Sequence, residues 1–581
     1  MAALVACATV IAYLPSLSGD FIWNDSDYVT APTLRSLAGL WQIWSQPGVT
    51  EQYYPLLHSA FWVQHQFWGD HTLPYHIVTI LLHAGSAVLF GLVLRQLFQR
   101  EPVPSVTPKG AKGSAAKTIP APTAPNRYGG AEWLAALIFA LHPVHVESVA
   151  WITEQKNTLS LVFYLLAALT YLRYDRTREP GPYYVALGWF VLSLLCKTVT
   201  ASLPAALLVA FWWKRGRLDW RRDFQPLIPW LVIGAGVGLF TSWVEQHYLG
   251  AKGQDFNLPI LSRTLIAGRA VWFYLGKFAW PFDLNFIYPR WVPNPAVAWQ
   301  WLYPLGVLAL AAALWAVRRH SRAPLAAFLI FVGSLFPVLG FVNLYGSLYS
   351  FVWDHWQYLP DLGLAALAGA GLARAWSWTS IRLEWAGPAA AAVLAGFLGA
   401  LAWDHCAMFH DDTVLFHTTL ERNPGAWMAH FNLGGHLSNT PSREAEAVPE
   451  FEAALRINPD LPDAHYNLGT ILARIPGRLP EALGHFDMAI RLAPDNAAIR
   501  YNYGNVLLRI PDRHADAIVQ YREAVRLNPG LAEAHYNLGI ALIENPANVP
   551  EAITHFEAAL KINPNFPLAQ EIMRRWNAGQ R

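Results

Sequence analysis

Two patterns of hydrophobic and polar positions divide the chain. Through residues 1–404, apolar runs of about the length that crosses a bilayer follow one another, beginning with the run from Ala2 to Leu17. Through residues 411–581, apolar residues instead recur at the spacing of one helix face, with polar residues between them. The patterns predict an all-α chain with a polytopic membrane domain over residues 1–404 and a second helical domain over residues 405–581.

The second part repeats itself every 35 residues. The stretch Ala429-His-Phe-Asn-Leu-Gly434 returns in varied form at residues 464–469, 499–504 and 534–539. A second helix in each unit is marked by an alanine followed four residues later by an aromatic residue, at Ala447 and Phe451, Ala482 and Phe486, Ala517 and Tyr521, and Ala552 and Phe556. This pattern is typical of tetratricopeptide repeats, which are helix pairs of about 34 residues.

We expect about four such repeats, a single helix near residues 412–422 before them, and a capping helix after Asn565. The concave face of a repeat array suits an extended peptide, so the array is a candidate recognition or docking module. The alternative is that the repeats pack against the membrane domain and serve stability.

Composition agrees with a membrane protein and excludes other classes. The 581 residues are 54% hydrophobic and only 14% charged, and the mean hydropathy is positive. The formal net charge of +2 gives no bulk attraction to nucleic acid. Three isolated cysteines provide neither a disulfide framework nor a zinc site.

Basic residues predict the orientation in the membrane. They cluster near residues 100–127, 173–178, 214–222, 318–322 and 374–382, whereas the loops at 19–72, 142–158 and 344–357 hold few of them. Because cytoplasmic loops carry the excess of Lys and Arg, the clusters are assigned to the cytoplasm and the three loops to the opposite side.

This assignment predicts about eleven crossings, with the N-terminus inside and the repeats outside. It requires residues 260–298 to stay at the outer face as a re-entrant or interfacial segment. The linker over residues 99–128, rich in Pro, Ala, Lys and Thr, is expected to be disordered in the cytoplasm.

Acidic residues stand in the first outer loop, where Asp25 and Asp27 lie within Phe21-Ile-Trp-Asn-Asp-Ser-Asp-Tyr28. Carboxylates beside a bilayer are costly to desolvate and tend to mark function. At a membrane surface such a group can act as a general base toward a lipid-carried substrate. The alternative is a solvated loop that caps a helix, since Asn and Asp are favoured there.

Three further polar sets are expected at the outer face. They are Tyr54 with His65, His76 and His83; the segment holding His142, His145, Glu147, Trp151, Glu154, Gln155, Lys156 and Asn157; and Lys197 with Arg263, Arg269, Lys277, Tyr288, Arg290, Asp354, His355 and Tyr358. His142 and His145 could ligate a metal, but no third ligand at fixed spacing completes a set, so no metal is expected. The basic residues could snorkel toward lipid headgroups or bind a lipid phosphate, and their gathering in one outer region favours the phosphate.

Several of these segments resemble a known family. The resemblance rests on the loop from Phe21 to Tyr28, on Tyr53-Tyr-Pro-Leu56, Tyr75 to Ala84, Ala136 to Ala150, Leu195-Cys-Lys197 and Asp354-His-Trp-Gln-Tyr-Leu-Pro360. Together they are similar to the transmembrane, tetratricopeptide-repeat-containing O-mannosyltransferases, and closest to bacterial relatives. The resemblance implies a GT-C glycosyltransferase fold that transfers a sugar from a polyprenyl-phosphate carrier at the non-cytoplasmic face. The family usually has adjacent acids after the first helix, whereas this chain has Asn24 followed by Asp25.

The resemblance implies roles for the candidate residues. Asp25, assisted by Asp27, would deprotonate an acceptor hydroxyl that attacks the anomeric carbon with inversion. The expected phosphate-binding residues are Lys197, Arg269, Lys277, His142 and Arg290. The expected sugar and acceptor pocket comprises Trp23, Asn24, Tyr54, His65, His145, Glu147, Glu154, Tyr288, Asp354 and His355. No diffusible cofactor is expected, because the donor arrives activated on its lipid.

The sugar is mannose or another hexose on this interpretation, and the acceptor is a protein hydroxyl. The location is a bacterial inner membrane with periplasmic repeats, or the membrane of the endoplasmic reticulum with luminal repeats in a eukaryote. The rival hypotheses are a repeat scaffold anchored in the membrane without catalysis and a lipid transporter. An anchor needs only one or two helices, and a transporter favours ionisable groups near the bilayer centre with inverted repeats.

Overall fold

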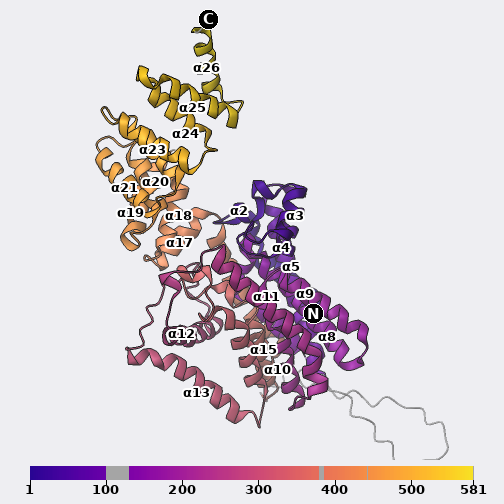
Figure 1. The fold of residues 1–581 in the computed structure, drawn as a ribbon. Coiled ribbons are helices and arrows are strands. Elements are labelled where there is room, and N and C mark those ends of the chain that lie inside the picture. Colours follow the sequence, from indigo (N-terminus) through magenta and orange to yellow (C-terminus); the bar gives the residue numbers. More distant parts are fainter. Residues whose placement is uncertain (100–129, 379–384, 441, 580–581) are drawn as a thin grey trace, which may run out of the picture. The chain divides into compact units, whose positions relative to one another are not determined.

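The computed structural model describes residues 1–99, 130–378, 385–440 and 442–579. The described part forms two compact units, Met1–Asn423 and Pro424–Arg581, and its regular elements are helical (Figure 1). The all-α prediction is therefore confirmed for the described residues. Residues 100–128 of the predicted linker, and the basic residues within them, lie outside the described part.

Seventeen α-helices of the first unit are described. They are α1 (Ala2–Ala12), α2 (Asp25–Thr30), α3 (Leu37–Ser45), α4 (Pro55–Trp68), α5 (Thr72–Phe98), α6 (Ala131–Leu141), α7 (Val146–Ala150), α8 (Gln155–Thr177), α9 (Pro180–Leu194), α10 (Leu203–Arg215), α11 (Ile228–His247), α12 (Ile260–Ala279), α13 (Leu302–Val317), α14 (Ala323–Leu335), α15 (Asp361–Trp378), α16 (Ala386–Cys406) and α17 (Asp412–Arg422). Short 3-10 and π turns connect many of them.

The number of membrane crossings is a correction to the sequence prediction. Among the described residues, four helical segments are long and apolar enough to span a bilayer, or five if the bent pair α6 and α7 counts as one span. The four are Thr72–Phe98, Trp220–His247, Ala298–Val317 and Ala386–Phe409. Eleven crossings are not supported, because helices such as α1, α9 and α10 have only 11, 15 and 13 residues, below the roughly 20 that a span needs.

The segment 260–298 contains α12, a helix of 20 residues that is not among the candidate spans. Its Arg263, Arg269 and Lys277 reduce its hydropathy. The structure contains no membrane, so the re-entrant or interfacial position of this segment stays a prediction.

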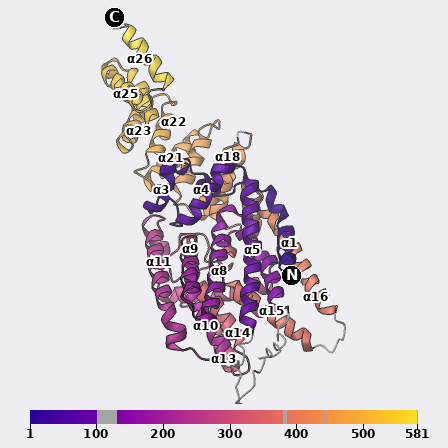
Figure 2. The same cartoon turned by 90° about the vertical axis from the view of Figure 1, so that its right-hand side faces the viewer.

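α8 separates two ends of the first unit. It has 23 residues, a length of about 34 Å, and packs against α5 and α9 (Figure 2). At its C-terminal end three predicted basic clusters meet: the Arg178 side chain donates to the Arg222 carbonyl at 3.1 Å, Arg215 pairs with Asp175, and an Arg322 nitrogen donates to the Trp212 carbonyl at 3.2 Å. The opposite end of α8, just after Glu154, adjoins α2 and α4.

The boundary between the units differs from the expected one at residue 404. The helix expected near residues 412–422 is present as α17, but it belongs to the first unit, which ends at Asn423. Its Phe416 and Thr419 are buried, and the Asn423 amide donates to the carbonyl of Ile287 at 3.1 Å. These contacts tie α17 to the loop after α12, which explains the later boundary.

The second unit consists of four helix pairs and a final helix. The pairs are α18 (Trp427–Ser438) with α19 (Glu444–Ile457), α20 (Pro462–Leu472) with α21 (Leu479–Leu492), α22 (Ala497–Leu507) with α23 (His514–Leu527), and α24 (Ala532–Ile543) with α25 (Val549–Ile562), followed by α26 (Pro567–Gly579). The predicted repeats are confirmed. Glycines of the first helices allow close approach to aromatic rings of the second: a Cβ on Gly539 would lie 2.7 Å from the Phe556 ring.

Candidate active site

A cavity of about 630 Å³ opens at the end of the first unit where α8 begins. Its wall combines aromatic and charged side chains drawn from five parts of the chain. The aromatic members are Trp23, Trp151, Tyr248, Tyr345, Tyr349, Trp353 and Trp356, and the polar members include Asn24, Glu51, Gln52, Glu154, Lys156, Glu245 and His355. The Trp23 ring stacks between two others, 5.3 Å from Trp151 and 6.1 Å from Trp353 between centroids.

Glu154 organises the cationic side of this cavity. Its carboxylate lies 2.7 Å from the Lys156 ammonium and 3.3 Å from that of Lys197, and it accepts a hydrogen bond from the Asn157 amide at 2.7 Å. Burial alone would raise the pKa of Glu154, but neighbouring charges outweigh burial and lower the pKa to about 2. The lowered pKa favours the ionised carboxylate of Glu154, which pairs with both lysines.

The two lysines have different positions. Lys156 lines the cavity, and its ammonium also lies 5.7 Å from the centre of the Trp151 ring. Lys197 is not a lining residue and donates to the Asn157 side-chain oxygen at 2.6 Å. Burial lowers the pKa of Lys197 to about 8.

Hydrogen bonds hold the cavity residues His355 and Glu245 in position. The His355 ring and its backbone N–H both bind Glu147, at 2.8 and 2.9 Å. Glu245 accepts from the Gln52 amide at 3.2 Å and from the Tyr345 N–H at 3.0 Å. Glu147 therefore positions a cavity residue rather than lining the cavity itself.

Asp25 lies directly behind the cavity wall formed by Trp23 and Asn24. One carboxylate oxygen accepts from the Ile22 N–H at 3.0 Å, and the other accepts from the N–H and hydroxyl of Thr153 at 2.7 and 2.6 Å. The side chain is fully buried, and burial raises its pKa to about 7 despite these hydrogen bonds. The loop is strained beside it: Trp23 has φ +47°, and its N–H donates to Asp412 of α17 at 2.7 Å.

Other residues predicted in the first loop and in α4 lie elsewhere. Asp27 is exposed and is not a lining residue. Tyr54 is buried in an apolar cluster with Leu57 and Phe61. His65, whose side chain is mostly buried, lies 3.5 Å from the exposed Asp70 carboxylate.

The predicted histidine pair makes no metal site. His142 bonds to the Phe278 carbonyl at 2.9 Å, and His145 bonds to the Phe139 carbonyl at 2.7 Å and to Asp361 at 3.2 Å. Within the described residues, no group of three or more His, Cys, Asp and Glu side chains could hold a metal ion.

The predicted phosphate-binding residues are not brought together. Arg269 lies over the Trp291 ring at 4.4 Å, and Arg290 pairs with Asp255 at 3.2 Å. Lys277 donates to the carbonyls of Phe282 and Asp283 at 2.7 and 2.9 Å. None of these three is among the residues that line the cavity.

Tyr288 and Asp354 form a pair next to this set. The Tyr288 hydroxyl lies 2.9 Å from both carboxylate oxygens of Asp354, and Lys277 lies 5.3 Å from the Tyr288 ring. Both side chains are buried and absent from the lining of the described cavity.

Of the residues predicted for the pocket, Trp23, Asn24, Glu154 and His355 line this cavity. Lys156 belongs to the predicted outer segment from His142 to Asn157, without a predicted role, whereas Glu51 and Glu245 were not predicted. Glu245 could not be predicted, since its place depends on α11 lying beside a loop 193 residues earlier.

The class of protein is defined by a helical unit that has candidate membrane spans and an aromatic, charged cavity and is joined to a repeat array. Two regions match sequence profiles: residues 443–497 match the tetratricopeptide repeat and residues 513–545 match the TPR repeat. The crystal structure of YrrB, a TPR protein, is similar at a TM-score of 0.25 and 23% identity, covering 35% of this chain and 97% of that one.

A more specific similarity is to curated proteins that also match the first unit over part of their length. Protein O-mannosyl-transferase TMTC4 of Homo sapiens is 28% identical over 207 residues, 34% of this chain and 26% of that protein. TMTC2 of Mus musculus is 26% identical over 310 residues, 47% and 33% of the two chains. TMTC1 of Homo sapiens is 25% identical over 437 residues, 65% and 46% of the two chains.

The chain is a distant relative of these repeat-containing protein O-mannosyl-transferases. The matched segments span less than half the length of each of these relatives.

Proposed function

We propose that this chain is a multi-pass membrane glycosyltransferase of the GT-C type. It moves mannose or another hexose from a polyprenyl-phosphate donor to a protein hydroxyl, with inversion at the anomeric carbon. The observation that carries this proposal is the cavity that combines stacked tryptophans with carboxylates and a lysine. Aromatic faces pack on the apolar faces of a sugar, carboxylates accept from its hydroxyls, and an ammonium pairs with a phosphate.

Asp25 is the proposed base. General bases work best when their pKa is near the operating pH, and the pKa of Asp25 is about 7. Glu154 is a poorer candidate because its pKa is held near 2. In the transfer the acceptor oxygen bonds to the anomeric carbon, its proton passes to Asp25, and the bond from carbon to phosphate oxygen breaks with its electrons leaving on the phosphate.

Asp25 must reach the acceptor from behind the wall. It is two residues from Trp23, and the strained backbone of Trp23 donates a hydrogen bond from its N–H to the Asp412 carboxylate. A shift of this loop when the substrates bind would bring the carboxylate into the cavity. Catalytic hydrogen bonds often tighten only in the complex with substrate.

Lys156 is the proposed partner of the departing phosphate. It lines the cavity, and Glu154 fixes its position. Lys197 stands behind it and adds positive charge to the same region. The site needs no diffusible cofactor on this mechanism, because the lipid phosphate is itself the leaving group.

The cavity is assigned to the non-cytoplasmic face. The clusters around Arg178, Arg215 and Arg322 meet at the other end of α8, and positive residues favour the cytoplasmic side. The repeats are proposed to present the acceptor polypeptide on their concave face. The chain would reside in a bacterial inner membrane, or in that of the endoplasmic reticulum in a eukaryote.

The test is sugar transfer by the purified full chain from a panel of radiolabelled polyprenyl-phosphate sugars to polypeptide acceptors. Asp25→Asn is expected to lower transfer by about 10²- to 10⁴-fold, whereas Asp20→Asn, an exposed acid of the same loop, is the matched control. Loss with Asp27→Asn alone would move the base by two residues. If the wild type consumes no donor while the repeats capture a polypeptide, a scaffold replaces the enzyme.

A further inference from the structure

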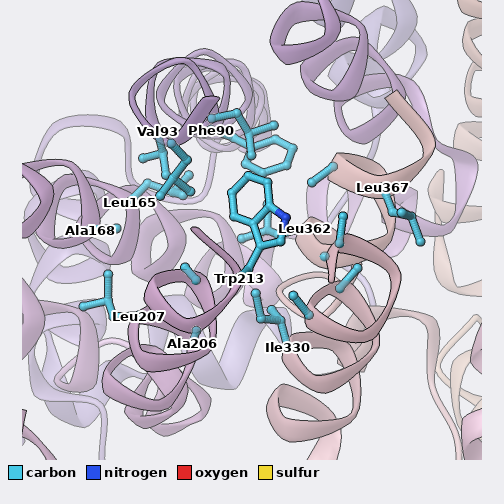
Figure 3. A pocket seen from close by; sticks show the side chains of 18 of the residues that line it. Phe90, Val93, Leu165, Ala168, Ala206, Leu207, Trp213, Ile330, Leu362 and Leu367 are labelled. Carbon is cyan, nitrogen blue, oxygen red and sulfur yellow. The ribbon is translucent and has the colours of Figure 1, made fainter. Parts of the chain in front are cut away.

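A second cavity lies between α5, α8, α10, α14 and α15, away from the candidate active site. Its volume is about 150 Å³, against about 630 Å³ for the candidate active-site cavity. Figure 3 shows Trp213 standing in this space, between Phe90, Val93 and Leu165 on one side and Ile330 and Leu362 on the other. The lining is almost wholly apolar. The hydroxyl of Tyr164, one of the lining residues, is hydrogen-bonded to Ser202.

Small residues keep this cavity open. Alanines line it on four helices, among them Ala168, Ala206, Ala326 and Ala366. At Gly363 a Cβ would lie 2.7 Å from the carbonyl oxygen of Ala327, so α14 and α15 touch there and leave the remaining space unfilled. An apolar space of this kind does not hold water and accepts an apolar molecule instead.

Two cations are chain neighbours of residues that line the cavity. Trp213 precedes Lys214, and Ala323 follows Arg322. Arg322 donates to the Trp212 carbonyl at 3.2 Å, which holds its guanidinium beside the end of α10. Positive charge next to an apolar slot in a membrane-spanning unit complements a lipid with an anionic headgroup.

We propose that this cavity binds one acyl chain of an anionic phospholipid, with the lipid phosphate against Lys214 and Arg322. This lipid is not the sugar donor, because the site lies toward the end of α8 opposite Glu154 and Lys156. The proposal stands independently of the glycosyltransferase function. The bound acyl chain would fill the space between two groups of helices, with α5, α8 and α10 on one side and α14 and α15 on the other.

The first experiment extracts and quantifies the lipids that stay with the full chain, purified in detergent, after gel filtration. We expect about one anionic phospholipid per chain. Ala206→Phe and Ala366→Phe, which fill the cavity, should each lower that ratio at least about tenfold. Ala392→Phe is the matched control, because Ala392 lies exposed on α16. Lys214→Gln should keep the lipid content and reduce the preference for anionic headgroups.

The second experiment needs no variant. Phosphatidylglycerol with a photoreactive diazirine in one acyl chain, added to the wild-type chain, should label peptides of α5, α10 and α15. Labelling confined to the exposed faces of α13 and α16 would overturn the proposal. Full lipid content in both filled variants would overturn it too, as would recovery of a polyprenyl phosphate in place of the phospholipid.

Discussion

The two units of the chain bury very different side chains. In the described part of the repeat unit, the buried polar residues are His465 and His535, and the rest of the core is apolar. The first unit buries a whole set of ionisable groups, among them Asp25, Glu147, Glu154, Lys156, Asp354, His355 and Asp361. Buried charge is costly unless it is paired, so its concentration in one unit supports the proposal that the active site lies there. The repeats follow from helix packing alone.

The largest expected effect contrasts the same substitution in the two units. Glu154→Gln leaves the buried Lys156 and Lys197 without their anion, and we expect the free energy of unfolding to fall by about 3–5 kcal/mol. Glu481→Gln removes an exposed pair with Arg478 and should cause no measurable loss. Denaturant titrations of both variants, followed by circular dichroism in the same detergent, give the comparison. Equal losses would mean that burial does not distinguish the units.

The second prediction concerns the pH dependence of transfer. Burial raises the pKa of Asp25 to about 7, and a base must be ionised to accept a proton. Activity is therefore present above pH 7 and should fall about tenfold for each pH unit below it. The measurement is kcat/KM against pH for the wild type and for Asp20→Asn, which should share one profile. A flat profile from pH 5 to 8 would remove Asp25 as the titrating group.

Sequence predicted the repeat unit nearly completely because each repeat depends on neighbours within about 35 residues. The membrane unit was harder: the crossings were overcounted since short apolar helices such as α1 and α10 look like spans in a hydropathy pattern. At the candidate site, Trp23 and Glu154 were predicted from local motifs, and both line the cavity. Glu245 was missed, because its partner Gln52 is brought to it only by the fold.

The third prediction tests the close packing that defines the repeats. Gly539→Ala places a Cβ 2.7 Å from the Phe556 ring, and we expect a loss of about 1–3 kcal/mol. Gly435→Ala is the matched control, since nothing lies within 4 Å of its Cβ and alanine favours a helix by about 0.5–1 kcal/mol. Urea unfolding of the fragment 424–581, which has its own core, measures both. The prediction fails if the two substitutions shift the midpoint in the same direction.

The smallest expected effect is a pH response confined to alternate repeats. At one position on the first helix of each pair, the side chain donates a hydrogen bond to the carbonyl of a preceding proline and contacts the residue 20 positions later. The four contacts are His430 with Glu450, His465 with His485, Arg500 with Gln520, and His535 with His555. In the second and fourth repeats the two imidazoles lie 2.9 and 3.0 Å apart, and only one of each pair can donate.

Acid should therefore weaken the second and fourth repeats. Burial lowers the pKa of His465, His485 and His555 below the ordinary 6.5, so the unfolded chain binds more protons and stability falls as pH drops below 6.5. Around the first pair, Asp460, Glu452 and Glu481 oppose the effect and Arg478 adds to it; around the second, Glu551 opposes and Arg522 adds.

We expect the denaturation temperature of fragment 424–581 to fall by less than about 4 °C between pH 7 and pH 5. His485→Gln combined with His555→Gln copies the amide acceptor of the third repeat and should remove most of that fall. An unchanged pH response in this double variant would assign the acid sensitivity to other groups. With either result, an acid response of the fragment would mean that the repeat unit, like the first unit, holds titratable groups whose ionisation changes its stability.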